Sequence, residues 1–365
     1  MHPFMTQALA LAQQSQTLTS PNPHVGCVIV SADGQLLGQG FTQRAGAAHA
    51  EIMALRDAQA LGRSVQGATA YVTLEPCSHQ GRTGPCCDAL INAGIRQVVA
   101  SIADPNPLVA GQGFERLRAA GIAVEVGQGA QASRELNIGF FSRMLRQRPW
   151  VRLKVAASLD GKTALPNGAS QWITSEAARA DGHAWRALSC AVLTGIGTVL
   201  HDNPRLDVRL PATERQPHLI VLDSTLRTPL DAKLFQPGRK LLVYTASRDE
   251  AKIEALQERG AQLICLPDAD GKVDLTALLH DLAHHEINDL HIEAGQTLNG
   301  ALIGANMVDD FIVYLAPKLI GQGADMTGFG PLSALADAPT LEFKSVERLG
   351  VDLRIVARVT GHDAF

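Results

Sequence analysis

The sequence predicts two consecutive α/β domains, residues 1–146 and 147–365. A chain of 365 residues is long for a single hydrophobic core, which favours two domains. Apolar residues make up 46% of the chain and charged residues 19%, so each half can bury a sizeable core. Strand-like apolar runs alternate with helical patterns in both halves, and the polar run Arg146-Gln147-Arg148-Pro149 lies between them.

The alternation in the first half predicts a three-layer α/β domain. An amphipathic helix is expected over residues 1–16, followed by a hairpin around the turn Asp33-Gly34. His49 and Cys86 each begin a helical pattern. The expected strands are 25–30, 35–41, 68–74, 97–102 and 122–126, and the expected helices are 49–61, 86–93, 113–120 and 130–145.

The second half also has an α/β pattern, but its chemistry is harder to infer. The run 194–198 contains G-x-G without the third glycine of a dinucleotide fingerprint. The turn at 293–300 follows a strand and opens a helix, where backbone N–H groups can hold a phosphate. Such turns also occur without ligands, and residues 322–341 are expected to form an irregular loop. The expected strands are 150–156, 191–193, 218–222, 240–244, 262–266, 289–293 and 310–315.

Composition excludes several classes of protein. The net charge is -4 and no basic patch with interleaved aromatic residues occurs, which disfavours a nucleic-acid partner. No apolar run approaches the roughly 20 residues of a membrane span, and the N-terminus lacks the features of a signal peptide. Six cysteines in so long a chain do not form a disulfide framework. These observations predict a cytoplasmic protein.

His49, Cys77 and Cys86 are the candidate ligands of one zinc ion per chain. One imidazole and two thiolates suit a tetrahedral zinc whose fourth position is open to water. Glu51, two residues after His49, is the candidate catalytic group that carries protons. H-x-E followed by P-C is typical of zinc-dependent deaminases of nucleobases and related heterocycles. The second cysteine is nine residues after the first, where the usual spacing is three.

Other interpretations of these residues remain open from the sequence. The histidine and cysteines could simply be buried, or Cys87 could complete a closed structural zinc site. His79 could be a further metal ligand, but the favoured interpretation is that it faces the substrate from the loop. A non-catalytic metal-stabilised regulator is disfavoured because a structural zinc does not need Glu51. A nucleic-acid-editing deaminase is disfavoured by the net charge and by the long loop between the cysteines.

Longer runs of the sequence resemble the bifunctional RibD family of riboflavin biosynthesis enzymes over almost the whole chain. The runs that carry this resemblance are PNPHVGC at 21–27, HAE at 49–51, TLEPCSHQGRTGPC at 73–86, DPNP at 104–107, ASLDGK at 157–162, SQWIT at 170–174, DNP at 202–204 and EAG at 293–295.

The resemblance implies two reactions in two domains. A cytidine-deaminase-like first domain deaminates 2,5-diamino-6-(5-phosphoribosylamino)pyrimidin-4(3H)-one. A second domain, similar in fold to dihydrofolate reductase, then uses NADPH to reduce the ribosyl group and gives 5-amino-6-(5-phosphoribitylamino)uracil. An inactive second domain is the main alternative among enzymes. The sequence does not determine the oligomeric state, and a homo-oligomer is compatible with it.

The resemblance also implies the residues that bind the small molecules. Arginine suits a phosphate because its planar guanidinium donates two parallel hydrogen bonds. Without the resemblance, Arg186 and Arg209 would be interpreted as solvated charges on the surface. The implied NADPH site comprises Ala156, Trp172, Thr198, Asp202, Ser224, Gly295, Gln296, Thr297, Leu298, Asn299, Gly300 and Ala301. The expected substrate contacts are Asn22 and His79 in the first domain and Lys154, Ser170, Arg186, Leu206, Arg209 and Glu293 in the second.

Overall fold

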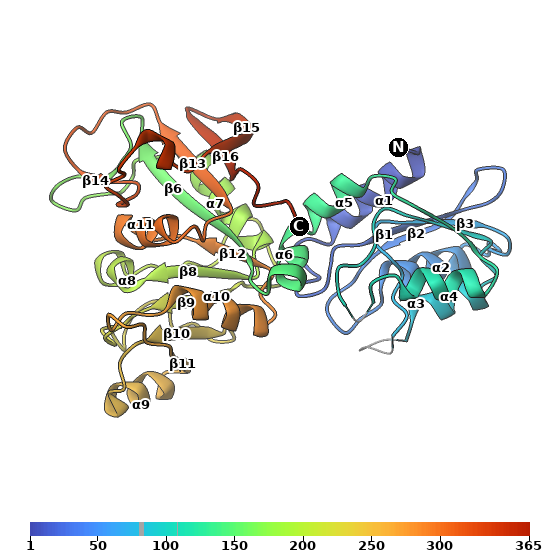
Figure 1. Ribbon diagram of the computed structural model, residues 1–365, viewed down its shortest axis with the longest axis horizontal. Helices are drawn as coiled ribbons and strands as arrows, with labels where there is room; N and C mark the ends of the chain where they lie inside the picture. Colours follow the sequence, from blue (N-terminus) through green and yellow to red (C-terminus); the bar gives the residue numbers. More distant parts are fainter. Residues whose placement is uncertain (80–83, 108) are drawn as a thin grey trace. The chain divides into compact units, whose positions relative to one another are not determined.

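The computed structural model describes residues 1–79, 84–107 and 109–365. The chain forms two compact units, an N-terminal domain of Met1–Gln147 and a C-terminal domain of Arg148–Phe365 (Figure 1). This division lies one residue beyond the expected boundary. Residues 80–83, in the loop between Cys77 and Cys86, lie outside the described part of the chain.

The N-terminal domain contains a mixed five-stranded sheet in the order β2-β1-β3-β4-β5. The first three strands pair antiparallel, as the hairpin pattern predicts, and β3, β4 and β5 pair parallel. Every residue of β1 is buried, which explains its uninterrupted apolar sequence. The strands are β1 (Gly26–Val30), β2 (Leu36–Phe41), β3 (Thr69–Val72), β4 (Gln97–Ala100) and β5 (Ala123–Val126).

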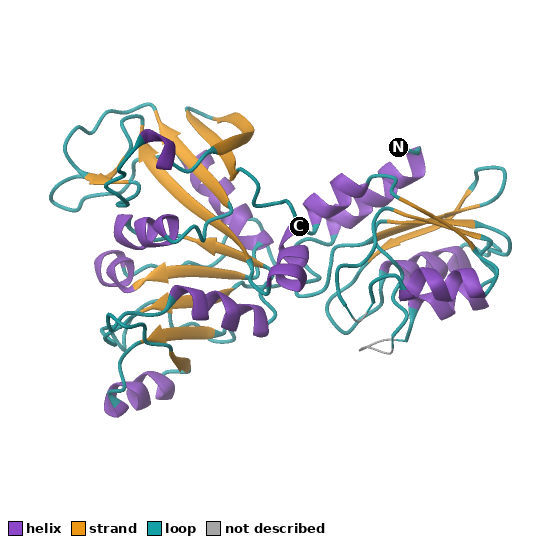
Figure 2. Ribbon diagram, in the orientation of Figure 1, coloured by secondary structure: helices purple, strands orange, loops and turns teal. Residues whose placement is uncertain are grey.

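Helices cover both faces of this sheet and make three layers (Figures 1 and 2). α1 and α5 lie on one face, and α2, α3 and α4 lie on the other. In α1, Met5, Ala8, Leu9 and Ala12 are buried, which is the spacing of one apolar helix face. The helices are α1 (Pro3–Gln14), α2 (Ala50–Ala60), α3 (Cys86–Asn92), α4 (Gln112–Ala119), α5 (Ala130–Leu136) and α6 (Ile138–Arg146).

The prediction of one helix over residues 130–145 is wrong, because the chain breaks into α5 and α6 at Asn137. The Asn137 side chain accepts a hydrogen bond from the backbone N–H of His24 and donates to the carbonyls of His24 and Ser133. Asparagine side chains compete in this way with regular helical hydrogen bonds. Asn137 therefore interrupts the helix and ties it to the segment before β1.

The C-terminal domain contains a nine-stranded sheet in the order β11-β10-β9-β8-β12-β6-β13-β16-β15. The first seven strands in this order, from β11 through β13, pair parallel with their neighbours. The last two strands, β16 and β15, extend the sheet in antiparallel pairing. A separate pair joins β7 to β14. The strands are β6 (Trp150–Ser158), β7 (Lys162–Ala164), β8 (Ala191–Gly195), β9 (His218–Leu222), β10 (Leu241–Thr245), β11 (Ala261–Cys265), β12 (Asp289–Ile292), β13 (Asp310–Ala316), β14 (Ala324–Asp325), β15 (Leu341–Leu349) and β16 (Asp352–Val359).

The parallel strands bring the segments that are expected to bind ligands together at one end of the sheet. β8 leads into α8 and β12 leads into α11, so the carboxyl ends of these strands meet beside β6. Crevices at such strand ends commonly bind ligands in α/β domains. The helices are α7 (Glu176–Leu188), α8 (Ile196–Asp202), α9 (Glu250–Glu258), α10 (Leu275–His284) and α11 (Gln296–Gly304). Among the described residues, no helix has the length and apolar character needed to cross a bilayer.

The sequence did not predict β15 and β16. Almost every residue of β15 is exposed, so this edge strand lacks the alternation of buried and exposed residues that identifies a half-buried strand. The loop expected at 322–341 is largely irregular, but it contains β14 and a short 3₁₀ turn, Leu335–Asp337.

We propose that the two domains fold independently, because each has its own sheet and buried core. A fragment of residues 148–365 should give one cooperative calorimetric transition, with the midpoint that this domain shows in the full chain. A fragment that aggregates, or unfolds without a cooperative transition, would show that the N-terminal domain is needed to complete its core.

Candidate functional sites

His49, Cys77 and Cys86 meet at one point in the N-terminal domain. His49 caps the N-terminus of α2, Cys77 follows β3, and Cys86 is the first residue of α3. The Nδ1 atom of His49 lies 3.6 Å from Cys77 Sγ and 3.4 Å from Cys86 Sγ. A tetrahedral zinc with Zn–S near 2.3 Å and Zn–N near 2.0 Å needs a nitrogen–sulfur separation of about 3.5 Å. The three side chains therefore fit a zinc ion.

The surroundings of Cys77 favour its thiolate form. Its sulfur accepts a hydrogen bond from the backbone N–H of Cys86 at 3.3 Å. Hydrogen bonding from the Cys86 side chain lowers the pKa of Cys77, burial acts in the opposite direction, and hydrogen bonding from His49 lowers the pKa further. A thiolate is the form that binds a metal ion.

Cys87 points away from this cluster, although it is adjacent to Cys86. Its thiol donates to the carbonyl of Pro76 at 3.1 Å and to the carbonyl of Gly113 at 3.5 Å. Among the described residues, only His49, Cys77 and Cys86 gather as a group that could hold a metal ion. The geometry thus supports three protein ligands and does not support a closed site with Cys87.

Glu51 lies in the first turn of α2 and is buried, with 4% of its surface exposed. Burial, together with the nearby Cys77 thiolate, raises the pKa of the Glu51 carboxyl to about 7. A carboxyl group with a pKa near neutrality can both accept and donate protons at physiological pH. This property suits a proton carrier beside an activated water molecule.

Glu75 is a residue whose role the sequence did not reveal. Its buried carboxylate accepts hydrogen bonds from four backbone N–H groups, those of Asp104, Gly111, Gly113 and Phe114, at 2.8–3.4 Å. It lies two residues before Cys77, so these bonds hold the turn that carries this ligand. Glu75 stands inside the conspicuous TLEPC run, but nothing in the sequence indicates partners 29 to 39 residues away.

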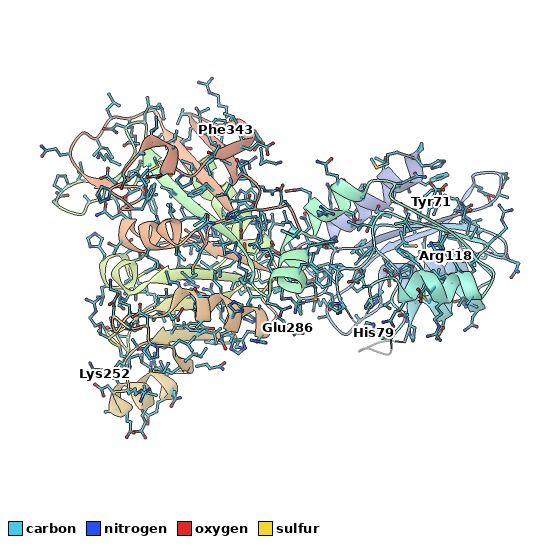
Figure 3. The ribbon with its side chains drawn as sticks, in the orientation of Figure 1. Tyr71, His79, Arg118, Lys252, Glu286 and Phe343 are labelled. Carbon is cyan, nitrogen blue, oxygen red and sulfur yellow. The ribbon has the colours of Figure 1, made fainter. Side chains whose placement is uncertain are left out.

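The two expected substrate contacts of the N-terminal domain lie in its loops. Asn22 is half-buried before β1, and its backbone N–H donates to the carbonyl of Thr19 at 2.9 Å. His79 is exposed beyond Cys77 (Figure 3). His79 does not belong to the ligand cluster, and its role in binding the substrate stays a prediction.

The C-terminal domain has a cleft of about 1710 Å³ at the carboxyl ends of its strands. Gly295 caps α11 there, with open space where a Cβ atom would project, so backbone N–H groups are accessible to a phosphate. All of the expected cofactor and substrate residues of this domain line the cleft except two, Asn299 and Gly300.

Asn299 and Gly300 do not line the cleft, and their expected contact with the cofactor stays a prediction. Both are buried, and Asn299 donates to the carbonyls of Ala294 and Met326 at 3.2 and 3.0 Å. A Cβ atom on Gly300 would lie 2.2 Å from the carbonyl oxygen of Gly328. Successive helix residues face different directions, so these two support the 326–328 segment behind the cleft while their neighbours face it.

Glu293 and Arg186 form a buried ion pair at the wall of the cleft, with 12% and 14% of their side chains exposed. Both oxygens of Glu293 accept from the Arg186 guanidinium, and Lys154 Nζ lies 3.5 Å from Oε2. Burial alone would raise the pKa of Glu293, but the charges of Arg186 and Lys154 hold it well below its ordinary value. Arg186 is thus largely committed to protein partners.

Arg209 is more accessible than Arg186, with 51% of its side chain exposed. Its Nη1 donates to Asp207, whose other carboxylate oxygen pairs with Arg205 at 2.8 Å. Burial would raise the pKa of Asp207, but the hydrogen bonds from Arg209 and Arg205 outweigh it and lower that pKa. Asp207 therefore orients Arg209 through Nη1, and the Nη2 group of Arg209 faces His183 instead.

Comparisons with known proteins agree with this division of the chain. Residues 1–102 match the family model of the cytidine and deoxycytidylate deaminase zinc-binding region, and residues 149–355 match that of the RibD C-terminal domain. The riboflavin biosynthesis protein RibD of Escherichia coli K12 is 46% identical, over 96% of this chain and 97% of that protein.

Two solved structures resemble both domains. Acinetobacter baumannii RibD, form 1, has a TM-score of 0.89 and 42% identity over 98% of each chain. The diaminohydroxyphosphoribosylaminopyrimidine deaminase/5-amino-6-(5-phosphoribosylamino)uracil reductase of Thermotoga maritima has a TM-score of 0.87 and 33% identity, over 98% of this chain and 97% of that one. These matches confirm the predicted fold class.

The geometry of the ligand cluster leads to a test with an internal control. Cys77→Ser should lose most of its bound zinc, because a hydroxyl replaces a thiolate ligand. Cys87→Ser alters the adjacent thiol and should retain one zinc per chain. Elemental analysis of the purified variants measures both. A full equivalent of zinc in Cys77→Ser, or its loss in Cys87→Ser, would contradict the assignment.

Proposed function

This chain belongs to the RibD family of riboflavin biosynthesis proteins, and we propose how its residues share the two reactions of that family. The family's enzymes combine a zinc-dependent deaminase domain with an NADPH-dependent reductase domain. They convert 2,5-diamino-6-(5-phosphoribosylamino)pyrimidin-4(3H)-one into 5-amino-6-(5-phosphoribitylamino)uracil. The observation that carries the assignment is the arrangement of His49, Cys77 and Cys86 beside a buried Glu51.

In the deaminase domain, we propose that His49, Cys77 and Cys86 hold the zinc and that Glu51 moves the protons. Zinc, when bound, makes a water molecule acidic enough to act as a nucleophile near neutral pH. Glu51 takes one proton from the attacking water and passes it to a ring nitrogen. It then moves the second proton of that water, from the newly added hydroxyl group to the amino group, which leaves as ammonia while the ring carbon keeps the oxygen. The raised pKa of Glu51 supports both transfers. Asn22 and His79 are the proposed contacts to the pyrimidine.

In the reductase domain, the cleft holds NADPH and the deaminated intermediate together. NADPH supplies the hydride, and the protein supplies position and charge. We propose that the turn at Gly295 and the start of α11 bind a cofactor phosphate. Arg209 is the better candidate for the substrate phosphate because it is accessible, whereas Arg186 positions Glu293 at the wall of the cleft. Lys154 and Ser170 complete the proposed substrate contacts.

A direct assay tests both halves of the proposal. The purified chain should convert the diaminopyrimidine substrate to the deaminated intermediate without NADPH, and to the ribityl product with NADPH. Mass spectrometry distinguishes the products, since deamination adds about 1 Da and reduction adds about 2 Da. A chain that deaminates but never oxidises NADPH would have an inactive reductase half. A chain with neither activity would refute the proposal.

Glu51→Gln tests the proton carrier, because it keeps the shape of the side chain but removes its ability to accept a proton. General acid–base steps contribute roughly a hundred- to ten-thousand-fold in rate, so deamination should fall by at least that lower factor. Zinc content and reduction of the separately supplied intermediate should be unchanged. Near-normal ammonia release by this variant would rule out the role of Glu51.

We also infer that a second copy of this chain docks on the edge of the C-terminal sheet. Phe343 (Figure 3) and Val346 lie on β15, the last strand of the sheet, and Val351 lies in the following turn. Their exposed fractions are 68%, 56% and 63%, and exposed apolar residues on an edge strand favour association with another chain. Phe343→Asp should shift the chain toward monomer in sedimentation velocity, whereas Leu335→Asp, at another exposed apolar position, should not. A wild-type chain that is monomeric at micromolar concentration would refute this inference.

A cytoplasmic location is proposed from the chemistry of the cysteines. None of the six forms a disulfide, and Cys77 and Cys86 must stay reduced to bind zinc. Cell fractionation that recovers the chain from an extracytoplasmic compartment would contradict this proposal. The net charge of -4 likewise supports small-molecule substrates over nucleic acid.

A further inference from the structure

His183, on α7, is surrounded by hydrogen-bond donors. Its Nδ1 atom faces the backbone N–H of Arg209 at 3.4 Å and Nη1 of Arg186 at 3.5 Å. Its Nε2 atom faces Nη2 of Arg209 at 3.3 Å. Arginine side chains and backbone N–H groups donate hydrogen bonds and cannot accept them. Among the described residues, every group in hydrogen-bond contact with this ring is therefore a donor, although the carboxylates of Glu293 and Asp207 lie near enough to act on its charge.

A neutral imidazole can accept a hydrogen bond at only one of its two nitrogens, so it cannot accept from the donors on both sides. Burial, together with the charges of Arg186 and Arg209, lowers the pKa of His183, so the ring is neutral at physiological pH. A neutral ring has one N–H group and one acceptor nitrogen. Nδ1 faces two donors and is best used as the acceptor, which puts the hydrogen on Nε2. The Nε2–H group of His183 and the Nη2 group of Arg209 then meet as two donors with no acceptor between them.

The position of these two donors indicates what satisfies them. His183 is 8% exposed and Arg209 half exposed, and both line the cleft of the reductase domain. Arg209 is held from its other side by Asp207, so its Nη2 group stays beside the histidine. Within the described residues, no protein oxygen is in hydrogen-bond contact with Nε2 of His183. An acceptor with several lone pairs and negative charge, entering from the cleft, would resolve the conflict between the donors.

We propose that His183 Nε2–H and Arg209 Nη2 together bind the phosphate of the reductase substrate, which makes His183 a substrate-binding residue. This inference rests on the proposed function, which supplies a substrate with a 5-phosphate. A phosphate in the same cleft could also belong to NADPH, and the experiment separates the two sources. Arg186 does not share this role, because Glu293 occupies its guanidinium.

The test compares substrates with and without the phosphate. His183→Leu removes the donor and should raise KM for the deaminated intermediate about tenfold, which corresponds to one hydrogen bond to a charged group. Its kcat and the KM for NADPH should change little. With the same compound lacking its 5-phosphate, wild type and His183→Leu should have the same KM. His183→Gln keeps an N–H donor and should recover most of the affinity for the phosphorylated substrate.

Two other outcomes of these measurements would contradict the proposed role of His183. An equal rise in KM for both substrates would mean that His183 only supports the cleft, and a raised KM for NADPH would assign the phosphate to the cofactor. Arg209→Ala should also abolish the preference for the phosphorylated substrate. If reduction and that preference persist in Arg209→Ala, the proposed clamp is wrong, although the reductase assignment stands.

A measurement on the wild-type chain covers the case in which the variants do not fold. The ring nitrogens of His183 should show the Nε2–H tautomer in a ¹⁵N NMR spectrum. Titration with inorganic phosphate should shift the Nε2 resonance, while the resonance of exposed His280, on α10, serves as a control. An Nδ1–H tautomer, or no selective shift at saturating phosphate, would refute the proposal.

Discussion

The expected zinc site depends on the Glu75 carboxylate, which ties the turn before Cys77 to backbone groups 29 to 39 residues later in the sequence. Its four backbone donors come from the segment at Asp104 and from the start of α4, while its own backbone leads directly to Pro76 and Cys77. Burying a carboxylate costs free energy unless its oxygens accept hydrogen bonds. Glu75 can therefore be buried only when these backbone N–H groups are brought against it. Gly113 is required for this approach, because a Cβ there would lie 2.1 Å from the Pro76 carbonyl oxygen.

A second buried carboxylate organises the reductase cleft by a different route. Glu293 follows β12. Burial would raise its pKa, but the charges of Arg186 and Lys154 outweigh burial and lower it, which favours the ionised form. This pairing explains why Arg186 and Arg209, which look equivalent in the sequence, have different proposed roles. Arg186 is held at the wall by Glu293, whereas Arg209 keeps one side free of Asp207 and lies beside His183. The positive charge available to a ligand is thus set by which carboxylates neutralise which arginines.

Residue identity and spacing predicted the parts of the molecule that depend on local chemistry. His49, Cys77 and Cys86 could be predicted to lie together because metal ligands are limited to few residue types, and the structure gathers them in one cluster. Their binding of zinc, and the role of Glu51 as proton carrier, stay predictions. The strand β1 could be recognised from its apolar sequence because it is buried throughout. The sequence could not reveal Glu75, whose partners are backbone groups brought close only by folding. It also missed β15, where exposure removes the period-two pattern, and the break at Asn137, which depends on hydrogen bonds to a distant loop. These features arise from tertiary contacts, which local pattern does not encode.

We propose that three side chains, and not four, hold the zinc, which leaves one position for water. Zinc-edge X-ray absorption of the purified chain measures this most directly. With His49, Cys77, Cys86 and one water as ligands, we expect two sulfur ligands at about 2.3 Å and two nitrogen or oxygen ligands at about 2.0 Å. Three sulfur ligands would place Cys87 or another thiol at the metal. A spectrum with one sulfur or none would remove Cys77 or Cys86 from the site, and either result would contradict the account.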